Sequence, residues 1–270
     1  MLRPVLKDDS QTVISWFLRH HVIESGMEGV VVGMSGGLDS SVVAKLAADA
    51  LGPDHVLGVL MPETTTPDEC MEDAEVMAGN WGIEVRTVDI LDGVEALGEM
   101  LDCEGDEDLG NVKSRVRMMT LYHIARTEGR MVLGTSNKSE LLTGYFTKWG
   151  DGASDLCPIG DLYKTQVTEL ASRIGVPQKV IDRVPSGDLW EGQTDEAELG
   201  IDYPTLDRIL LGIELAMDDE DIITGAKVDR EQVAHVRALV RGSVHKRRMG
   251  LVPKLGARTV GLDWREADLR

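Results

Sequence analysis

The chain has 270 residues, of which 42% are hydrophobic, and its 47 Asp and Glu outnumber its 28 Lys and Arg, giving a formal net charge of −19. This length suffices for one sizeable core, so we expect residues 1–270 to form a single domain. Such an acidic surface disfavours binding to nucleic acid or to anionic membranes, and no stretch approaches the ~20 apolar residues that span a bilayer.

The first 26 residues lack the pattern of a signal peptide, because charged residues interrupt every apolar run. We therefore expect a cytoplasmic protein. The three cysteines, Cys70, Cys103 and Cys157, are widely spaced and form neither a disulfide framework nor a CxxC pair, which indicates reduced thiols. The acidic residues are spread along the whole chain, which favours a surface adapted to high salt over a local functional acidic patch.

Short runs rich in Val and Ile alternate with longer helical stretches along the first half of the chain. We predict strands at 29–35, 55–62, 83–90 and 130–136. We predict helices at 40–52, 67–82, 111–129, 163–175 and 203–218. The acidic stretch 102–108 is expected to be a solvated loop, and 186–202 a polar loop.

Strands separated by helices imply right-handed crossovers. The predicted fold class is therefore α/β: a Rossmann-like, doubly wound parallel sheet with helices on both faces. In such sheets ligands bind at the carboxyl ends of the strands. Polar sequences follow three of the predicted strands: GMSGGLDSS, MPETTTP and GTSNKSE.

The stretch from Gly33 to Ser41 is a glycine-rich turn between a strand and a helix. Unpaired backbone N–H groups and the positive end of the helix dipole make such a turn suitable for a phosphate. It lacks the Gly-Lys-Ser ending of a P-loop and the spacing of a dinucleotide fingerprint. The alternative is an ordinary helix cap in which Asp39 and Ser40 satisfy free N–H groups.

The SGGLDSS motif resembles the pyrophosphate-binding loop of the N-type ATP pyrophosphatases, which are of the adenine nucleotide alpha hydrolase type. Three later stretches, NVKSRVRMMTLYHIA, VLGTSNKSELLTGYFTKWGDGASDLCPIGDLYKTQVTELA and PSGDLWEGQTDEAELG, resemble the ammonia-dependent NAD synthetase family, so the likeness covers most of residues 30–205. Two other hypotheses remain: another ATP pyrophosphatase, such as a tRNA-modifying enzyme, and a nucleotide-binding module without catalysis.

The resemblance implies a ligase that adenylates the nicotinate carboxylate of deamido-NAD with ATP, releases pyrophosphate, and lets ammonia displace AMP to give NAD. The implied cofactor is Mg²⁺, with Asp39 and Glu140 as metal ligands; without the resemblance, Glu140 could equally be a surface helix residue. The residues matching the family's ATP-binding positions are Gly33, Met34, Ser35, Gly36, Gly37, Leu38, Asp39, Ser40, Thr135, Lys164 and Ser186.

The resemblance also assigns a deamido-NAD site. Its matching positions are Arg115, Lys148, Asp155, His245 and Lys246. Asp155 and Lys164 are the expected catalytic residues, with Asp151 as an alternative base for deprotonating ammonium. Arg115 could instead be a helix-surface arginine, and we do not assign Arg117, which points elsewhere on the same helix. The basic residues near Lys246 could otherwise compensate a helix dipole.

At 187 this sequence departs from the family, since Ser-Gly-Asp replaces the more usual Ser/Thr-Ala-Asp. The segment from Trp190 to Asp195 has few aliphatic anchors, so we expect it to become ordered only with ligand. The chain has no room for an amidase domain. Its nitrogen source should therefore be free ammonia or ammonia from a separate amidase subunit, and the resemblance implies a homodimer.

Overall fold

The computed structural model describes residues 2–248 and 250–264. Four parallel strands form one sheet in the order β3-β2-β1-β4. Their bounds are Gly29–Gly33 for β1, Val56–Leu60 for β2, Glu84–Thr87 for β3 and Arg130–Leu133 for β4. All four strands were predicted, each with an extra residue or more at its ends, because the apolar runs continue into the loops.

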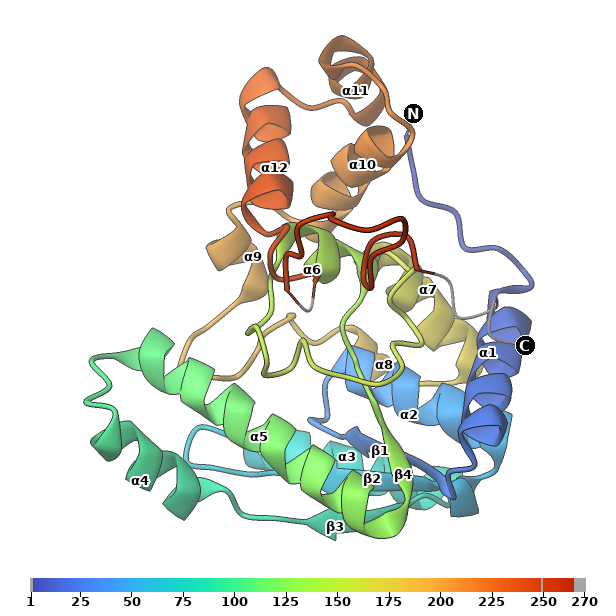
Figure 1. The fold of residues 1–270 in the computed structure, drawn as a ribbon, viewed down its shortest axis with the longest axis vertical. Helices are drawn as coiled ribbons and strands as arrows, with labels where there is room; N and C mark the ends of the chain where they lie inside the picture. Colours follow the sequence, from blue (N-terminus) through green and yellow to red (C-terminus); the bar gives the residue numbers. More distant parts are fainter. Residues whose placement is uncertain (1, 249, 265–270) are drawn as a thin grey trace.

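Helices cover both faces of this sheet (Figure 1). Val30 and Val32 face α2 (Leu38–Leu51) and the core shared with α1 (Ser10–Ser25), α3 (Asp68–Trp81) and α7 (Lys164–Ile174). Val31 faces the opposite side, where α5 (Asp106–Glu128) packs, and α4 (Leu91–Met100) packs on α5. This alternation, with β1 buried on both faces, confirms the predicted doubly wound α/β fold.

A second helical layer lies beyond the carboxyl edge of the sheet (Figure 1). Its own apolar cluster includes Tyr203, Leu206, Ile222 and Val236. Its helices are α6 (Lys138–Thr143), α9 (Asp195–Leu199), α10 (Tyr203–Glu214), α11 (Asp219–Ala226) and α12 (Arg230–Gly242), whereas the short α8 (Gln178–Ile181) packs on the main core next to α7. The amino-terminal segment reaches this layer, where Leu2 N donates to Gly225 O at 2.7 Å.

Two predicted loops proved partly helical. Asp106 to Asp108 form the acidic first turn of α5, where their charges face the positive end of the helix dipole. The predicted polar loop 186–202 contains α9, which begins after Thr194 and ends at Gly200 in the left-handed conformation. Neither the first turn of α5 nor α9 offers the apolar periodicity that sequence patterns detect. Within the part of the chain that the structure describes, no helix is long and apolar enough to cross a membrane.

Candidate active site

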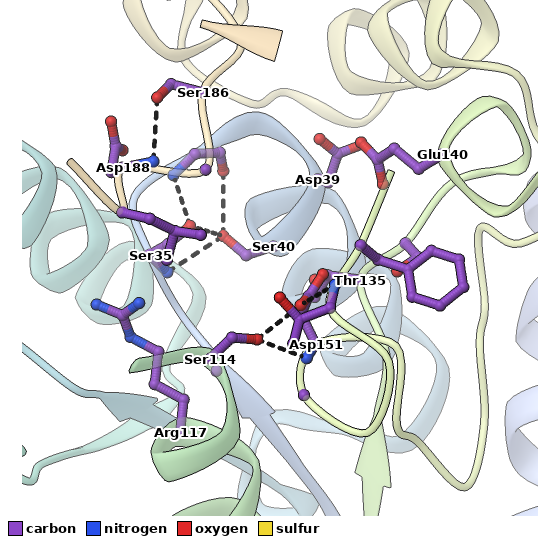
Figure 2. Close-up of a pocket in the computed structure, with 18 of the residues that line it drawn as sticks. Ser35, Asp39, Ser40, Ser114, Arg117, Thr135, Glu140, Asp151, Ser186 and Asp188 are labelled. Carbon is purple, nitrogen blue, oxygen red and sulfur yellow. Dashed lines mark hydrogen bonds between the residues drawn. The ribbon is translucent and has the colours of Figure 1, made fainter. Parts of the chain in front are cut away.

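A cleft of about 510 Å³ opens at the carboxyl ends of β1, β2 and β4 (Figure 2). Four walls surround it: the glycine-rich loop after β1, one face of α5, the loops on either side of α6, and the segment 183–190. Parallel strands bring their carboxyl ends to the same edge of the sheet. The ligand position predicted from the fold class therefore coincides with this cleft.

The glycine-rich loop is held by its own serines. Ser35 Oγ lies 3.0 Å from Ser40 Oγ (Figure 2). Ser41 Oγ donates to Gly37 O at 2.6 Å. Helix α2 starts after Gly37, which has no capping side chain, so the first N–H groups of the helix stay available. The structure therefore does not support the alternative that Asp39 and Ser40 merely cap the helix.

Seven of the eight predicted loop residues line the cleft: Gly33, Met34, Ser35, Gly37, Leu38, Asp39 and Ser40. Gly36 does not. Its φ is +76°, and its carbonyl points away to accept from Arg183 Nη1 at 2.7 Å. An added Cβ at Gly36 would lie 2.1 Å from Cys70 O, so only glycine fits there. Gly36 shapes the loop, whereas its neighbours face the ligand space.

Two carboxylates, of Asp39 and Glu140, meet across the cleft (Figure 2). Asn137 joins them, because its Nδ2 donates to Glu140 Oε1 at 2.6 Å and to Asp39 Oδ1 at 3.2 Å. Asn137 also forms a capping box with Glu140 at the start of α6, which fixes the direction of the Glu140 side chain. The alternative of a surface helix residue therefore does not hold for Glu140, which lines the cleft.

Lys164 is the cation of this cluster. Its Nζ hydrogen-bonds Asp39 and lies 3.8 Å from Glu140 Oε1. Burial alone would lower the pKa of Lys164, but these carboxylates raise it above its ordinary value. Burial and the neighbouring charge of Asp39 together raise the pKa of Glu140 well above its ordinary value. One lysine therefore leaves the pair of carboxylates only partly compensated.

Helix α10 fixes the position of Lys164. The completely buried Asp207 accepts from Ser139 Oγ at 2.5 Å and from Thr165 N at 2.9 Å. Ser139 Oγ in turn accepts from Lys164 N at 3.0 Å. This network joins the starts of α6 and α7 to α10, so Glu140 and Lys164 keep a constant separation.

The other two predicted ATP-binding residues also line the cleft. Thr135 follows β4 directly, and Ser186 lies in the segment opposite it (Figure 2). Ser186 Oγ accepts from Asp188 N at 3.0 Å, and Asp188 adopts a left-handed φ of +49°. The residues predicted for the glycine-rich loop, the metal and ATP come from distant parts of the sequence, and they lie around the same cleft.

The predicted deamido-NAD residues divide into two groups. Lys246 lines the cleft, and its Nζ donates to Gly144 O at 2.7 Å and to Phe146 O at 2.8 Å. The other four lie outside the cleft lining: Arg115, Lys148, Asp155 and His245. Asp155 accepts from Val132 N at 2.8 Å at the edge of β4, and Arg115 Nη2 lies 3.5 Å from Lys148 O. Their roles stay predictions.

The basic stretch after α12 serves two purposes. Arg247 donates to Leu142 O at 2.7 Å and to Val240 O at 2.8 Å, so it satisfies carbonyls at the ends of α6 and α12. The helix-end alternative therefore holds for Arg247. Among the residues of this stretch that the structure describes, Lys246 alone lines the cleft.

Arg117, which we did not assign because we expected it to point elsewhere on α5, lines the cleft, whereas the predicted Arg115 does not (Figure 2). Its Nη2 lies 3.9 Å from Glu63 Oε1, and burial lowers its pKa. Ser114, three residues earlier, donates to Asp151 Oδ1 at 2.7 Å and so holds the loop after α6. The helical spacing of Asn111, Ser114, Met118 and Leu121 on one face was the available signal.

Comparisons with known proteins agree with this geometry. The family model described as NAD synthase matches residues 11–250. A protein of Pyrococcus furiosus named NH3-dependent NAD+ synthetase is 50% identical over 86% of this chain and 90% of its own length. One with the same name from Methanosarcina mazei is 46% identical over 92% of this chain and 98% of its own length.

Solved structures show the same fold. An NMN synthetase from Francisella tularensis superposes with a TM-score of 0.81 at 33% identity, covering 92% of this chain and 98% of the other. The NH3-dependent NAD synthetase of Campylobacter jejuni, in complex with the nitrate ion, gives 0.78 at 28% identity, covering 91% and 98%. The family match over most of the chain and relatives at up to half identity show that this chain belongs to the NAD synthase family.

Proposed function

We propose that this chain converts the carboxyl group of deamido-NAD into an amide with ATP and free ammonia, giving NAD, AMP and pyrophosphate. The observation that carries the proposal is the convergence of the glycine-rich loop, the Asp39–Glu140 pair and Lys164 in one cleft. The ammonia-dependent relatives support the choice of nitrogen donor.

The chemistry explains why ATP is spent. A carboxylate resists attack by ammonia, so its oxygen first attacks the α-phosphate of ATP and pyrophosphate leaves. Ammonia then attacks the acyl carbon, the bond to AMP breaks, and a proton is released. The first step brings two nucleotides, a carboxylate and a leaving pyrophosphate together in one site. Fixed positive groups there stabilise the charge on the transferred phosphate.

The residues of the cleft suit these needs. The N–H groups at the start of α2 face anionic phosphate, and Ser35 and Ser40 offer hydroxyl donors. Lys164 brings a buried positive charge that Asp39 keeps protonated. We assign Thr135 and Ser186 to ATP on their position in the same cleft, and Lys164 and Asp155 keep their predicted catalytic roles.

The donor set at Asp39 and Glu140 fits Mg²⁺. Among the described residues no group of three or more His, Cys, Asp or Glu could hold a metal ion, and Mg²⁺ commonly uses only one or two carboxylates together with phosphate oxygens and waters. Asp39 and Glu140 would hold the ion, which when bound neutralises phosphate charge during transfer. The incomplete compensation of the two carboxylates by Lys164 supports this assignment.

Four further expectations belong to this proposal. The deamido-NAD site comprises Arg115, Lys148, Asp155, His245 and Lys246. The protein acts in the cytoplasm as a homodimer. It accepts ammonia from solution or from a separate amidase. Of the five substrate residues, Lys246 has the support of lining the same cleft as the ATP residues.

The competing functions receive less support. A tRNA-modifying ATP pyrophosphatase needs a basic face, whereas this chain carries a net charge of −19. A nucleotide sensor needs no carboxylate pair beside a buried lysine. The structural neighbour described as an NMN synthetase makes nicotinate mononucleotide the acceptor to test against deamido-NAD.

The test is product analysis of the purified protein with ATP, Mg²⁺, ammonium chloride and either deamido-NAD or nicotinate mononucleotide, in low and in molar KCl. We expect NAD, AMP and pyrophosphate in equal amounts from deamido-NAD. Lys164→Met should abolish all three, whereas Lys138→Met should not, because Lys138 pairs with Glu214 and Asp161 outside the cleft lining. Bound ATP without any amide product at either salt would refute the proposal.

A further inference from the structure

Lys113 is a buried cation that the cleft lining does not include. It lies on α5, one turn before Arg117, and is only 3% exposed. Its Nζ lies 2.7 Å from Leu189 O, 3.1 Å from Thr65 Oγ1 and 3.1 Å from Glu63 Oε2. An ammonium group has three donors, and three acceptors surround this one.

These acceptors come from two separate loops. Glu63 and Thr65 follow β2, whereas Leu189 belongs to the segment 183–190 that forms one wall of the cleft. The two loops also touch each other, since Thr65 Oγ1 lies 3.3 Å from Asp188 O. Lys113 therefore fastens both loops to α5 and to each other.

A close apolar contact lies one turn before Lys113. A Cβ added at Gly110 would lie 3.2 Å from Leu189 Cβ and 3.3 Å from Trp190 Cζ3. Within the segment itself, Gln193 Oε1 accepts from Leu189 N at 2.8 Å. The segment is thus fixed at Leu189 on both sides of its backbone, by Lys113 at the carbonyl and by Gln193 at the amide.

Stability alone does not account for this arrangement. The Glu63 and Lys113 side chains are 1% and 4% exposed, and burying an ion pair costs so much solvation that an apolar pair of similar volume is often as stable. An apolar side chain at 113, however, would leave Leu189 O without its donor. The function of Lys113 is therefore to hold segment 183–190, one wall of the cleft, in place.

We propose that Lys113 is a positioning residue, which holds segment 183–190 closed over the adenylated intermediate and so keeps water from it until ammonia attacks. This inference rests on the proposed function. In the side reaction a water oxygen attacks the acyl carbon, the bond to AMP breaks, deamido-NAD is regenerated and two protons are released. ATP is then consumed to AMP and pyrophosphate without amide formation.

The first test compares AMP with NAD produced by Lys113→Met. We expect the ratio of AMP to NAD, close to one in the unaltered protein, to rise several-fold, and the KM for ATP to rise by about tenfold as the wall opens. Lys138→Met, which loses a partly exposed ion pair away from the cleft, should keep the ratio near one. A ratio of one in Lys113→Met would overturn the proposal.

A double variant separates positioning from folding. Lys113→Met leaves buried Glu63 without its nearer cation, with only Arg117 at 3.9 Å, which destabilises the protein, and adding Glu63→Leu removes that charge. We expect the double variant to recover the midpoint of thermal unfolding but to retain the raised ratio of AMP to NAD. Recovery of a ratio near one would show that Lys113 acts only through stability.

Amide hydrogen exchange across residues 186–193 gives a readout that does not depend on catalysis. We expect about tenfold faster exchange of this segment in the double variant than in the unaltered protein, with α10 unchanged. If the unaltered protein makes no NAD but exchange still accelerates, the proposed function fails and the fastening stands. Unchanged exchange would refute the fastening itself.

Discussion

Asp39 and Glu140 stay together because two neighbours, Asn137 and Lys164, oppose their repulsion. Asn137 donates to both, Lys164 places a positive charge between them, and the capping box aligns Glu140. In the proposed function this pair would hold a second cation, a role that needs both carboxylates. The site is therefore most sensitive to changes that remove one charge and keep the shape.

Replacing either carboxylate by its amide tests this role. We expect Asp39→Asn and Glu140→Gln each to lower kcat/KM at fixed Mg²⁺ by about a hundredfold, since a bound metal contributes several kcal/mol. The half-saturating Mg²⁺ concentration should rise, as measured from steady-state rates over a magnesium series. Glu214→Gln is the matched control, because Glu214 pairs with Lys138 outside the cleft lining. An unchanged magnesium dependence in both variants would rule out these residues as ligands.

Asp73 sets a pH limit on stability. Burial alone would raise its pKa, but Lys179 and Arg183 hold the pKa below its ordinary value. Because the pKa of Asp73 is lower in the folded state, the stability that its ion pairs contribute is fully present above the unfolded pKa of about 3.9. This stability is lost as the pH falls through the folded-state pKa. We expect Asp73→Asn to lower the free energy of unfolding at pH 7 and to flatten its decline below pH 4.

Denaturant unfolding between pH 7 and pH 3 measures this effect. The exposed neighbour Glu72→Gln should follow the unaltered protein at every pH. The same steep acid decline in Asp73→Asn would contradict the assignment. Arg183 also donates to Gly36 O. Removing its ion pair with Asp73 should therefore disturb the glycine-rich loop and raise the KM for ATP.

Single residues show where sequence reasoning succeeds and where it ends. The place of the loop 33–40, apart from Gly36, and of Thr135, Lys164 and Ser186 around one cleft could be predicted because they lie in the stretches that resemble the family. The choice between Arg115 and Arg117 depends on which face of α5 meets the sheet, which a motif does not record. Lys113 escaped notice because its partners, at 63 and 189, are brought together only by the fold.

Among the elements, the glycine-rich loop leaves no room for a side chain at Gly36. Gly36→Ala places a Cβ 2.1 Å from Cys70 O and also strains a φ of +76°. We expect a lower unfolding midpoint and at least about a tenfold loss of kcat/KM, because the loop must shift away from α3. Gly175→Ala is the control: its φ is +80°, but nothing lies within 4 Å of an added Cβ.

Comparing these two variants separates the cost of backbone strain at positive φ from the cost of the steric clash with Cys70 O. Gly175→Ala should cost only about 1 kcal/mol of stability, as backbone strain requires, and keep full activity. Thermal unfolding and steady-state kinetics on both variants give the comparison. Equal effects at the two glycines would mean that contact with Cys70 O is irrelevant.

Helices and strands were predictable to the extent that they bury one face. Strands β1, β2 and β4 were found because they are apolar runs, and β3 because Ile and Val recur around its polar residues. Helix α2 was found because it is apolar on nearly all sides, and α3 because its buried positions recur at helical spacing. The first turn of α5 and the short α9 were missed because their residues are nearly all acidic. Their acidic first turns face the positive end of the helix dipole, and α9 also buries Leu199 in the second apolar cluster.

At the scale of the whole molecule, the charge of −19 opposes compactness. Salt shortens the range of repulsion from about 10 Å at 0.1 M to about 3 Å at 1 M. We expect the unfolding midpoint at pH 7 to rise by several degrees, roughly 5 °C, between 0.1 and 2 M KCl. Near pH 5, close to the isoelectric point of 4.7, the rise should shrink. A midpoint that is independent of KCl at pH 7 would contradict adaptation to high salt.

The position of β1 within the sheet bears on how the chain folds. Val30 pairs with Val56 on one side and with Met131, much further along the chain, on the other. Closing the longer loop costs roughly 1 kcal/mol more in chain entropy, so the β1–β2 pair should form before β4 arrives. During synthesis β2 would then pair with β1, next to the glycine-rich loop, long before β4 does. The cleft should be the last part of the molecule to mature.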